Sequence, residues 1–169
     1  VPSASWACGL PEGIPQPKGG MLIVEATIPL QRPLAVGRTP YGDRSVAVGS
    51  EGRLSGTRLS GTVATGALDF ELTLSNGVIE IEQILVLRTT DGSYILARAA
   101  GTGADASDVR VVVDFEAPSA SSFAWLNAGS YVARRVINMA ERSLTLRVFD
   151  VSGVTRRADA TSGAYLLNS

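Results

Sequence analysis

Residues 67–99, ALDFELTLSNGVIEIEQILVLRTTDGSYILARA, alternate apolar with polar side chains around two turn signals. Within 68–74 every second side chain is apolar, which is typical of a strand with one face against a core. The dipeptides Asn76-Gly77 and Asp91-Gly92 supply the left-handed backbone that a tight hairpin turn requires. The stretch therefore predicts three consecutive antiparallel strands.

Short apolar runs continue on both sides of this stretch at intervals of about ten residues, a spacing typical of a sandwich or barrel. The segment 53–63 is interpreted as two short pieces bent by glycines, which often mark bulges or barrel corners. Ser121–Asn127 predicts one short helix, ending near Gly129, as a plug or lid over one end. Further strands are predicted at 21–30, 44–48, 108–117 and 143–151. The expected fold class is all-β: a single antiparallel β-barrel of about nine strands with one short helix.

The length of 169 residues suits one well-buried core. Residues 1–20 are rich in proline and glycine and lack periodicity, which predicts an extended N-terminal arm. Trp6, Leu10 and Ile14 would anchor this arm on the domain or on a neighbouring subunit, and a flexible tail is the alternative. The predicted division is an arm at 1–20 and a β-barrel domain at 21–169, which we expect to form a homo-oligomer.

Composition and charge exclude several classes of function. Fifteen basic and sixteen acidic residues give a net charge of −1 without a basic block, so neither nucleic-acid nor membrane binding is expected. The chain has no histidine, the usual base near neutral pH and a common metal ligand. Cys8 is the only cysteine, so no internal disulfide forms. We therefore expect no metal and no cofactor. The first residue is Val1, and both a cytoplasmic location and secretion after removal of a leader stay open.

Four side chains carry the predicted catalytic chemistry. Asp69 lies in mid-strand beside Phe70, and a carboxyl in an apolar cavity becomes a better proton donor near neutral pH. Glu82 is a second candidate acid, or the base that works with Asp69. Tyr41 and Arg44 flank a turn, where a guanidinium would hold an oxyanion or phenolate through two hydrogen bonds. The alternative for each residue is structural, as an ordinary surface charge or surface ion pair.

Six segments, taken in order, are similar to the pattern of the domain-of-unknown-function family 3237. The similarity extends from about Ile23 to Val151. It implies a β-barrel, usually oligomeric, and in some fungal relatives a part in the biosynthesis of polyketide-derived phenols by cofactor-free cyclisation such as intramolecular hydroalkoxylation. The segments are GRTPYGDR (37–44), LSGTRLSGTV (54–63), GALDF (66–70), LRTTDG (87–92), AWLN (124–127) and LRVFDV (146–151). The residues that the resemblance carries over are Tyr41, Gly42, Arg44, Asp69, Arg88, Asp91 and Trp125.

The leading hypothesis is a cofactor-independent cyclase or isomerase that acts on an aromatic, phenolic small molecule. Arg44 would hold the phenolate, while Asp69 or Glu82 protonates an alkene carbon. A barrel that binds a hydrophobic ligand without changing it is the second hypothesis, and an assembly protein whose arm and barrel edge only build an oligomer is the third. The expected substrate-binding residues are Phe70, Arg88, Tyr94 and Trp125, the last because its ring offers a flat surface to an aromatic ligand.

Overall fold

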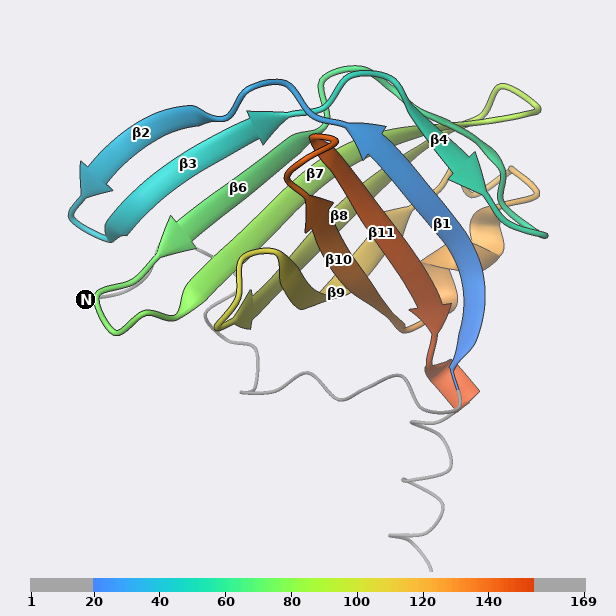
Figure 1. Cartoon of the computed structure of the whole chain (residues 1–169). Helices are drawn as coiled ribbons and strands as arrows, with labels where there is room; N and C mark the ends of the chain where they lie inside the picture. Colours follow the sequence, from blue (N-terminus) through green and yellow to red (C-terminus); the bar gives the residue numbers. More distant parts are fainter. Residues whose placement is uncertain (1–19, 154–169) are drawn as a thin grey trace, which may run out of the picture.

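The computed structural model describes residues 20–153, which form eleven strands and one short 3-10 helix (Figure 1). Every neighbouring pair of strands is antiparallel. The elements are β1 (Met21–Pro29), β2 (Leu34–Thr39), β3 (Gly42–Val48), β4 (Gly52–Ser55), β5 (Gly61–Val63), β6 (Leu68–Thr73), β7 (Ile79–Thr89), β8 (Tyr94–Gly103), β9 (Asp108–Glu116), the 3-10 helix η2 (Ala124–Ala128), β10 (Tyr131–Asn138) and β11 (Ser143–Asp150).

Eight strands close into a barrel in the order β7-β5-β4-β1-β11-β10-β9-β8, because β8 also pairs with β7. The other three strands, β2, β3 and β6, form a sheet that leaves the barrel along β7, and we call this sheet the extension. Figure 1 shows the extension as a curved layer to one side of the barrel. The closed barrel removes the free edges of its own strands, and β2 is left as the outer strand of the extension.

The length of β7 explains how one strand serves both sheets. Its first half, Ile79–Ile84, pairs with β6, whereas Leu87–Thr89 pairs with β5. The contact with β5 is close: a Cβ added to Gly61 would lie 2.1 Å from the carbonyl oxygen of Arg88, and the φ of Gly61 is +146°. Only glycine fits there, because any other residue would clash with the neighbouring backbone. The sheet therefore divides at β7, which places the extension beside one end of the barrel.

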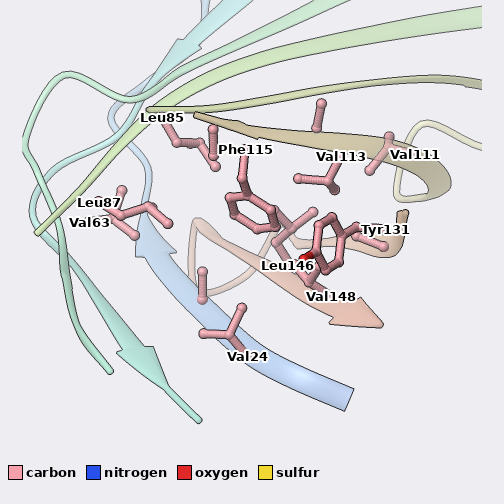
Figure 2. Packing of buried hydrophobic residues seen from close by; sticks show 14 of the residues in the cluster. Val24, Val63, Leu85, Leu87, Val111, Val113, Phe115, Tyr131, Leu146 and Val148 are labelled. Atoms are coloured by element: carbon pink, nitrogen blue, oxygen red, sulfur yellow. The ribbon is translucent and has the colours of Figure 1, made fainter. Parts of the chain in front are cut away.

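The barrel interior is filled by apolar side chains from alternate positions of its strands (Figure 2). On β9 these residues are Val109, Val111, Val113 and Phe115, all at most 6% exposed. The ring of Phe115 meets Tyr131 edge to face, with the ring centroids 5.0 Å apart. The barrel is therefore a packed core and not an open tube.

The predicted fold class is confirmed, and so are the hairpins at the two turn signals. The prediction of about nine strands misses β2 and β10. On β2 the apolar side chains of Leu34 and Val36 are exposed, and a bulge between Ala35 and Gly37 interrupts the alternation. On β10 two consecutive arginines hide the period of two, because one of them, Arg135, occupies the buried face.

The predicted helix at 121–127 is a 3-10 helix one turn long, Ala124–Ala128, with Leu126 as its buried residue. The predicted arm at 1–20 lies outside the described residues apart from Gly20, as do the last 16 residues of the predicted domain, 154–169. Within residues 20–153, no helix has the length and apolar character needed to cross a bilayer.

Candidate functional site

A cavity of about 500 Å³ lies where the extension meets one end of the barrel. Four groups of residues line it, and most of them are apolar or small. The strands of the extension give Ser45, Ala47, Asp69 and Glu71; the β8–β9 turn gives Asp105, Ala106 and Ser107; the β10–β11 hairpin gives Ile137, Met139 and Arg142; and the segment after β1 gives Leu30, Gln31 and Pro33. A concave, largely apolar site with a few polar groups is typical of small-molecule binding.

The alternation of β6 turns both of its acidic side chains toward this cavity. Asp69 and Glu71 are two residues apart, so they project from the same face of the strand. Their partners on β3 are Ala47 and Ser45, respectively. Because these partners are small, they leave space above the carboxylates. The polar face that the sequence predicts for β6 is thus the floor of the cavity.

Asp69 forms a buried ion pair with Arg135 of β10. The Nε atom of Arg135 donates to Oδ2 of Asp69 at 2.9 Å, and its Nη2 atom donates to Oδ1 at 2.5 Å. Gln83 donates through Nε2 to Oδ2 at 2.5 Å. The side chain of Arg135 is fully buried, and that of Asp69 is 6% exposed. The third nitrogen of the guanidinium, Nη1, donates to the carbonyl oxygen of Ala106, which fastens the β8–β9 turn to the ion pair.

Glu71, the other carboxyl that β6 turns toward the cavity, has a raised pKa. Burial raises the pKa of Glu71 above its ordinary value of 4.5, and the negative charge of Asp69 raises it further. The positive charge of Arg135 opposes both effects, but the net direction is upward. Glu71 therefore keeps its proton to higher pH than an exposed glutamate does. A carboxyl of this kind is suited to act as a general acid.

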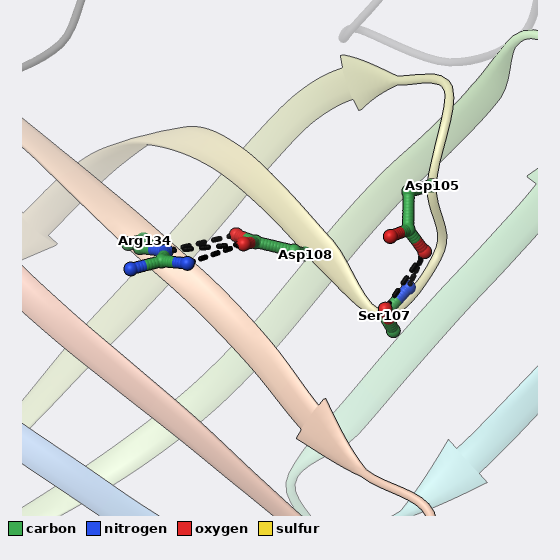
Figure 3. A network of polar contacts seen from close by, with 4 residues as sticks. All are labelled: Asp105, Ser107, Asp108 and Arg134. Carbon is green, nitrogen blue, oxygen red and sulfur yellow. Dashed lines mark hydrogen bonds and ion pairs between the residues drawn. The ribbon is translucent and has the colours of Figure 1, made fainter.

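The cavity is lined by a third carboxyl group, that of Asp105. Its Oδ1 atom accepts hydrogen bonds from the backbone nitrogen of Ser107 at 2.9 Å and from the Oγ atom of Ser107 at 2.7 Å (Figure 3). These hydrogen bonds lower the pKa of Asp105. Asp105 is therefore an ionised residue that orders its turn, in contrast to Glu71.

The structure separates the four predicted catalytic residues. Asp69 lies at the cavity, whereas Glu82 pairs with Phe70 in the register of β6 and β7, and both lie on the opposite face of that sheet. Arg44 pairs with Leu72 and belongs to the same opposite face. Tyr41 lies in the β2–β3 turn and is 45% exposed. Of the four predicted residues, Asp69 therefore lies at the cavity, and Glu82, Arg44 and Tyr41 lie away from it.

The predicted substrate-binding residues also lie away from this cavity. Arg88 and Tyr94 face each other across β7 and β8 on the outside of the barrel, and Tyr94 lines a separate hollow of about 560 Å³. Trp125 packs against the core, and the guanidinium of Arg58 lies 3.7 Å from the centre of its ring. Phe70 is on the face opposite Asp69. Their binding roles stay predictions.

Two site residues escaped the sequence analysis. Glu71 shares the predicted polar face with Asp69, so its position two residues along the strand was a usable signal. Arg135 belongs to a strand that was not predicted. Residues 131, 133, 135 and 137 alternate along the chain, and Arg135 is the charged member of a series that otherwise consists of Tyr131, Ala133 and Ile137. A charged residue on an apolar face points to a buried partner.

Two further observations concern groups that could take part in proton transfer or metal binding. Tyr131 is a tyrosine in the core, and burial is the main cause that raises its pKa to about 12, so it is a poor base at neutral pH. Among residues 20–153, no three side chains of the His, Cys, Asp and Glu types come together as a metal site would require.

Comparisons with known proteins identify relatives of the same fold. Residues 21–151 match the sequence model of a family described as "Protein of unknown function (DUF3237)". The comparison with curated proteins finds no match.

Among solved structures, a protein of unknown function from Clostridium acetobutylicum has 20% sequence identity and a TM-score of 0.69, over 78% of this chain and 97% of that one. A β-barrel-like protein from Acinetobacter baumannii has 18% identity and a TM-score of 0.66, over 78% and 94%. An enzyme from Penicillium herquei has 19% identity and a TM-score of 0.59, over 76% and 91%. At these identities the likeness shows the fold.

Proposed function

The chain belongs to the DUF3237 family, and within it we propose that this protein is a cofactor-independent cyclase or isomerase, with Glu71 as its general acid. The substrate is an apolar, phenolic small molecule that fills the cavity beside the extension. The observation that carries the proposal is the pairing of two unlike carboxyls on one cavity floor. Asp69 is locked in an ion pair, whereas Glu71 has a raised pKa and faces the same space.

The proposed reaction uses these groups in three steps. Glu71 donates its proton to an alkene carbon of the substrate, the phenol oxygen bonds to the neighbouring carbon, and the phenol proton returns to the Glu71 carboxylate. The product is a cyclic ether with the same atoms as the substrate, so no oxidant or reductant is consumed. Positioned acid–base catalysis of this kind contributes roughly 10²–10⁴-fold to the rate. Holding the two reacting groups together in the cavity adds to it.

Arg135 is a positioning residue in this account. It fixes the carboxylate of Asp69 through two hydrogen bonds and the β8–β9 turn through the carbonyl oxygen of Ala106. One guanidinium group therefore hydrogen-bonds both to Asp69 on the floor of the cavity and to the β8–β9 turn that forms one wall. The presence of an enzyme among the fungal proteins of this fold supports a catalytic reading.

The experiment compares the Glu71→Gln variant with a Glu82→Gln control, using ortho-prenylphenol as substrate. The control removes a carboxyl of the same type from the opposite face of the sheet. We expect Glu71→Gln to lower kcat by roughly 10²–10⁴-fold and Glu82→Gln to change it little, because only Glu71 reaches the substrate. Equal turnover in the wild type and in both variants would remove Glu71 from the mechanism.

A ligand-binding barrel without catalysis is the second candidate. It is favoured because both carboxylate oxygens of Asp69 already accept hydrogen bonds from Arg135 and Gln83, as they would in a purely structural ion pair. Native mass spectrometry of the protein with ortho-prenylphenol separates the two candidates. Ligand that is recovered bound and unaltered after long incubation supports binding alone, whereas the cyclised isomer supports catalysis.

A further inference from the structure

Arg142 occupies a backbone conformation that an arginine rarely adopts. It ends the β10–β11 turn with a φ of +48°, and among residues 20–153 no other residue besides glycine has a positive φ. Glycine or asparagine is favoured in this region, since a Cβ crowds the backbone there. The backbone carbonyl of Arg142 accepts a hydrogen bond from the nitrogen of Leu30 at 2.7 Å, so the strained residue is fixed in place. Strained backbone of this kind clusters at ligand-binding sites, and here it lies at the edge of a cavity.

The charge of Arg142 is not neutralised by any residue in the described range 20–153. Arg142 lines the cavity next to Met139, yet within residues 20–153 its guanidinium makes no hydrogen bond and no ion pair. Arg135, which lies behind the cavity lining, is fully engaged by Asp69 and Ala106. Arg142 is therefore the arginine that lines the cavity and is available to a ligand.

The remaining charges of the cavity fix the direction of a bound ligand. Asp69 and Glu71 lie on its floor, and Asp105 lies on the β8–β9 turn with its carboxylate bonded to Ser107. An anionic group of a ligand is repelled by the ionised carboxylate of Asp105 and gains nothing from Asp69, whose charge is compensated by Arg135, or from the protonated Glu71. The walls between them are apolar, so the hydrophobic part of the ligand fills the middle. An anion is then stabilised only at the end that Arg142 lines.

We propose that Arg142 binds an oxyanion of the ligand, a phenolate or a carboxylate, at the exposed end of this cavity. The cavity is thereby specific for an apolar molecule with one anionic end, whose other end reaches Glu71. This inference rests on the proposed function in using the same cavity, and the oxyanion that Arg142 binds is a group of the ligand other than the phenol that reacts at Glu71. A planar guanidinium suits both oxyanions, because it presents two parallel N–H donors.

The test measures binding by isothermal titration calorimetry with three probes of one shape: para-nitrophenol titrated at a pH where it is ionised, para-nitrobenzoate, and uncharged para-nitroanisole. The variants are Arg142→Gly, Arg142→Lys and, as a control for the loss of one positive charge, Arg98→Gln on the outside of the barrel. We expect Arg142→Gly to weaken both anions about tenfold, the effect of one charge-assisted hydrogen bond, and to leave para-nitroanisole unchanged. Arg142→Lys keeps part of the anion affinity.

The thermal midpoint separates this result from misfolding. Since glycine suits a φ of +48°, Arg142→Gly should melt at the same temperature as the wild type or higher. The proposal is overturned if Arg98→Gln weakens the anions as much as Arg142→Gly does, or if the wild type binds neither anion better than para-nitroanisole. A loss confined to one of the two anions identifies which oxyanion the site takes.

The same experiment distinguishes failure of this inference from failure of the proposed function. Binding of the probes needs no turnover, so Glu71→Gln should retain the preference for anions. Anion binding that depends on Arg142 in a protein that cyclises no phenol keeps the inference and contradicts the enzyme proposal. Turnover that depends on Glu71, in a protein whose anion binding is unchanged by Arg142→Gly, supports the enzyme proposal and contradicts this inference.

Discussion

Two neighbouring residues of β10 make the same kind of ion pair in opposite surroundings. Arg134 faces outward and pairs with Asp108 of β9, and Figure 3 shows this contact across the two strands. Arg135 faces inward and pairs with Asp69 of the extension. Both pairs have an Nη2 to carboxylate distance of 2.5 Å. The side chains of the outer pair are 56% and 37% exposed, whereas those of the inner pair are 0% and 6% exposed.

The difference teaches that burial, and not the ion pair itself, decides what these arginines do. In water the attraction between two charges is screened, so an exposed pair contributes about 0–1 kcal/mol to stability. Inside the protein the attraction is stronger, but the charges have lost their hydration, so they depend on one another and on further hydrogen bonds. Gln83 and the carbonyl of Ala106 supply those bonds. The inner pair is thus part of the cavity floor, while the outer pair joins two strands.

The largest expected effect comes from breaking the inner pair. Asp69→Asn leaves the guanidinium of Arg135 buried without its counter-charge, and we expect it to reduce the free energy of unfolding by about 3–5 kcal/mol. Asp108→Asn, the matched change in the outer pair, should reduce it by about 1 kcal/mol or less. Urea denaturation of both variants measures the difference. Equal losses would contradict the contrast between the two pairs.

A double variant sharpens this comparison. Asp69→Leu combined with Arg135→Met removes both buried charges, and a buried pair replaced by apolar side chains is often neutral in stability. We therefore expect the double variant to recover most of the stability that Asp69→Asn loses, although the cavity then lacks the Asp69–Arg135 ion pair. A double variant no more stable than Asp69→Asn would show that the hydrogen bonds to Gln83 and Ala106 dominate instead.

A smaller effect, of opposite sign, is expected at Glu71. Because the folded state raises the pKa of Glu71, it holds that proton more tightly than the unfolded state, so the contribution of Glu71 to stability is present at low pH and is lost as the pH rises above 4.5. Glu71→Gln removes this dependence and should stabilise the protein at neutral pH by no more than about 1 kcal/mol, since the group is only partly buried and solvent screens it. Thermal melts of wild type and variant from acid to neutral pH measure it. A stability difference between wild type and Glu71→Gln that is the same at acid and at neutral pH would contradict this origin.

The smallest effect is the pH dependence of the outer pair. The hydrogen bonds from Arg134 are the main cause that lowers the pKa of Asp108 below 3.8, so its contribution is present above that pH and is lost as the pH falls further. Screening by solvent keeps this contribution within about 0.5 kcal/mol. Arg134→Met should make acid unfolding begin at slightly higher pH, and added salt should shrink the difference from wild type. A difference that is unchanged in high salt would indicate a buried pair.

Local patterns in the sequence sufficed for the barrel strands and their inner faces. The alternation on β9 and β11 predicted the buried residues, and the two turn dipeptides predicted the hairpins around β7. β10 escaped because its buried arginine interrupts the apolar pattern. The ion pair to Asp69 joins residues 66 positions apart, so no local pattern specifies it.

The face of the sheet on which Glu82 lies is set by the length of the β6–β7 turn. A two-residue turn at Asn76-Gly77 would pair Glu82 with Glu71 and bring it to the cavity face. The observed loop has three residues, 75–77, with Gly77 at a φ of +83° and Leu74 bonded to Val78. This loop shifts the register by one residue, and such a shift reverses the facing of every side chain on the strand.

The central claim is that the cavity floor holds a carboxyl whose pKa is raised, beside one that is tied down. Carbon-13 NMR titration of the Glu71 carboxyl in the full chain tests it most directly, with Arg134→Met and Arg135→Met as paired variants. We predict a pKa above 4.5 in the wild type, unchanged by Arg134→Met and higher in Arg135→Met, because Arg135 is the charge that lowers it. A Glu71 pKa at or below 4.5, or one that responds equally to both arginines, would contradict the account.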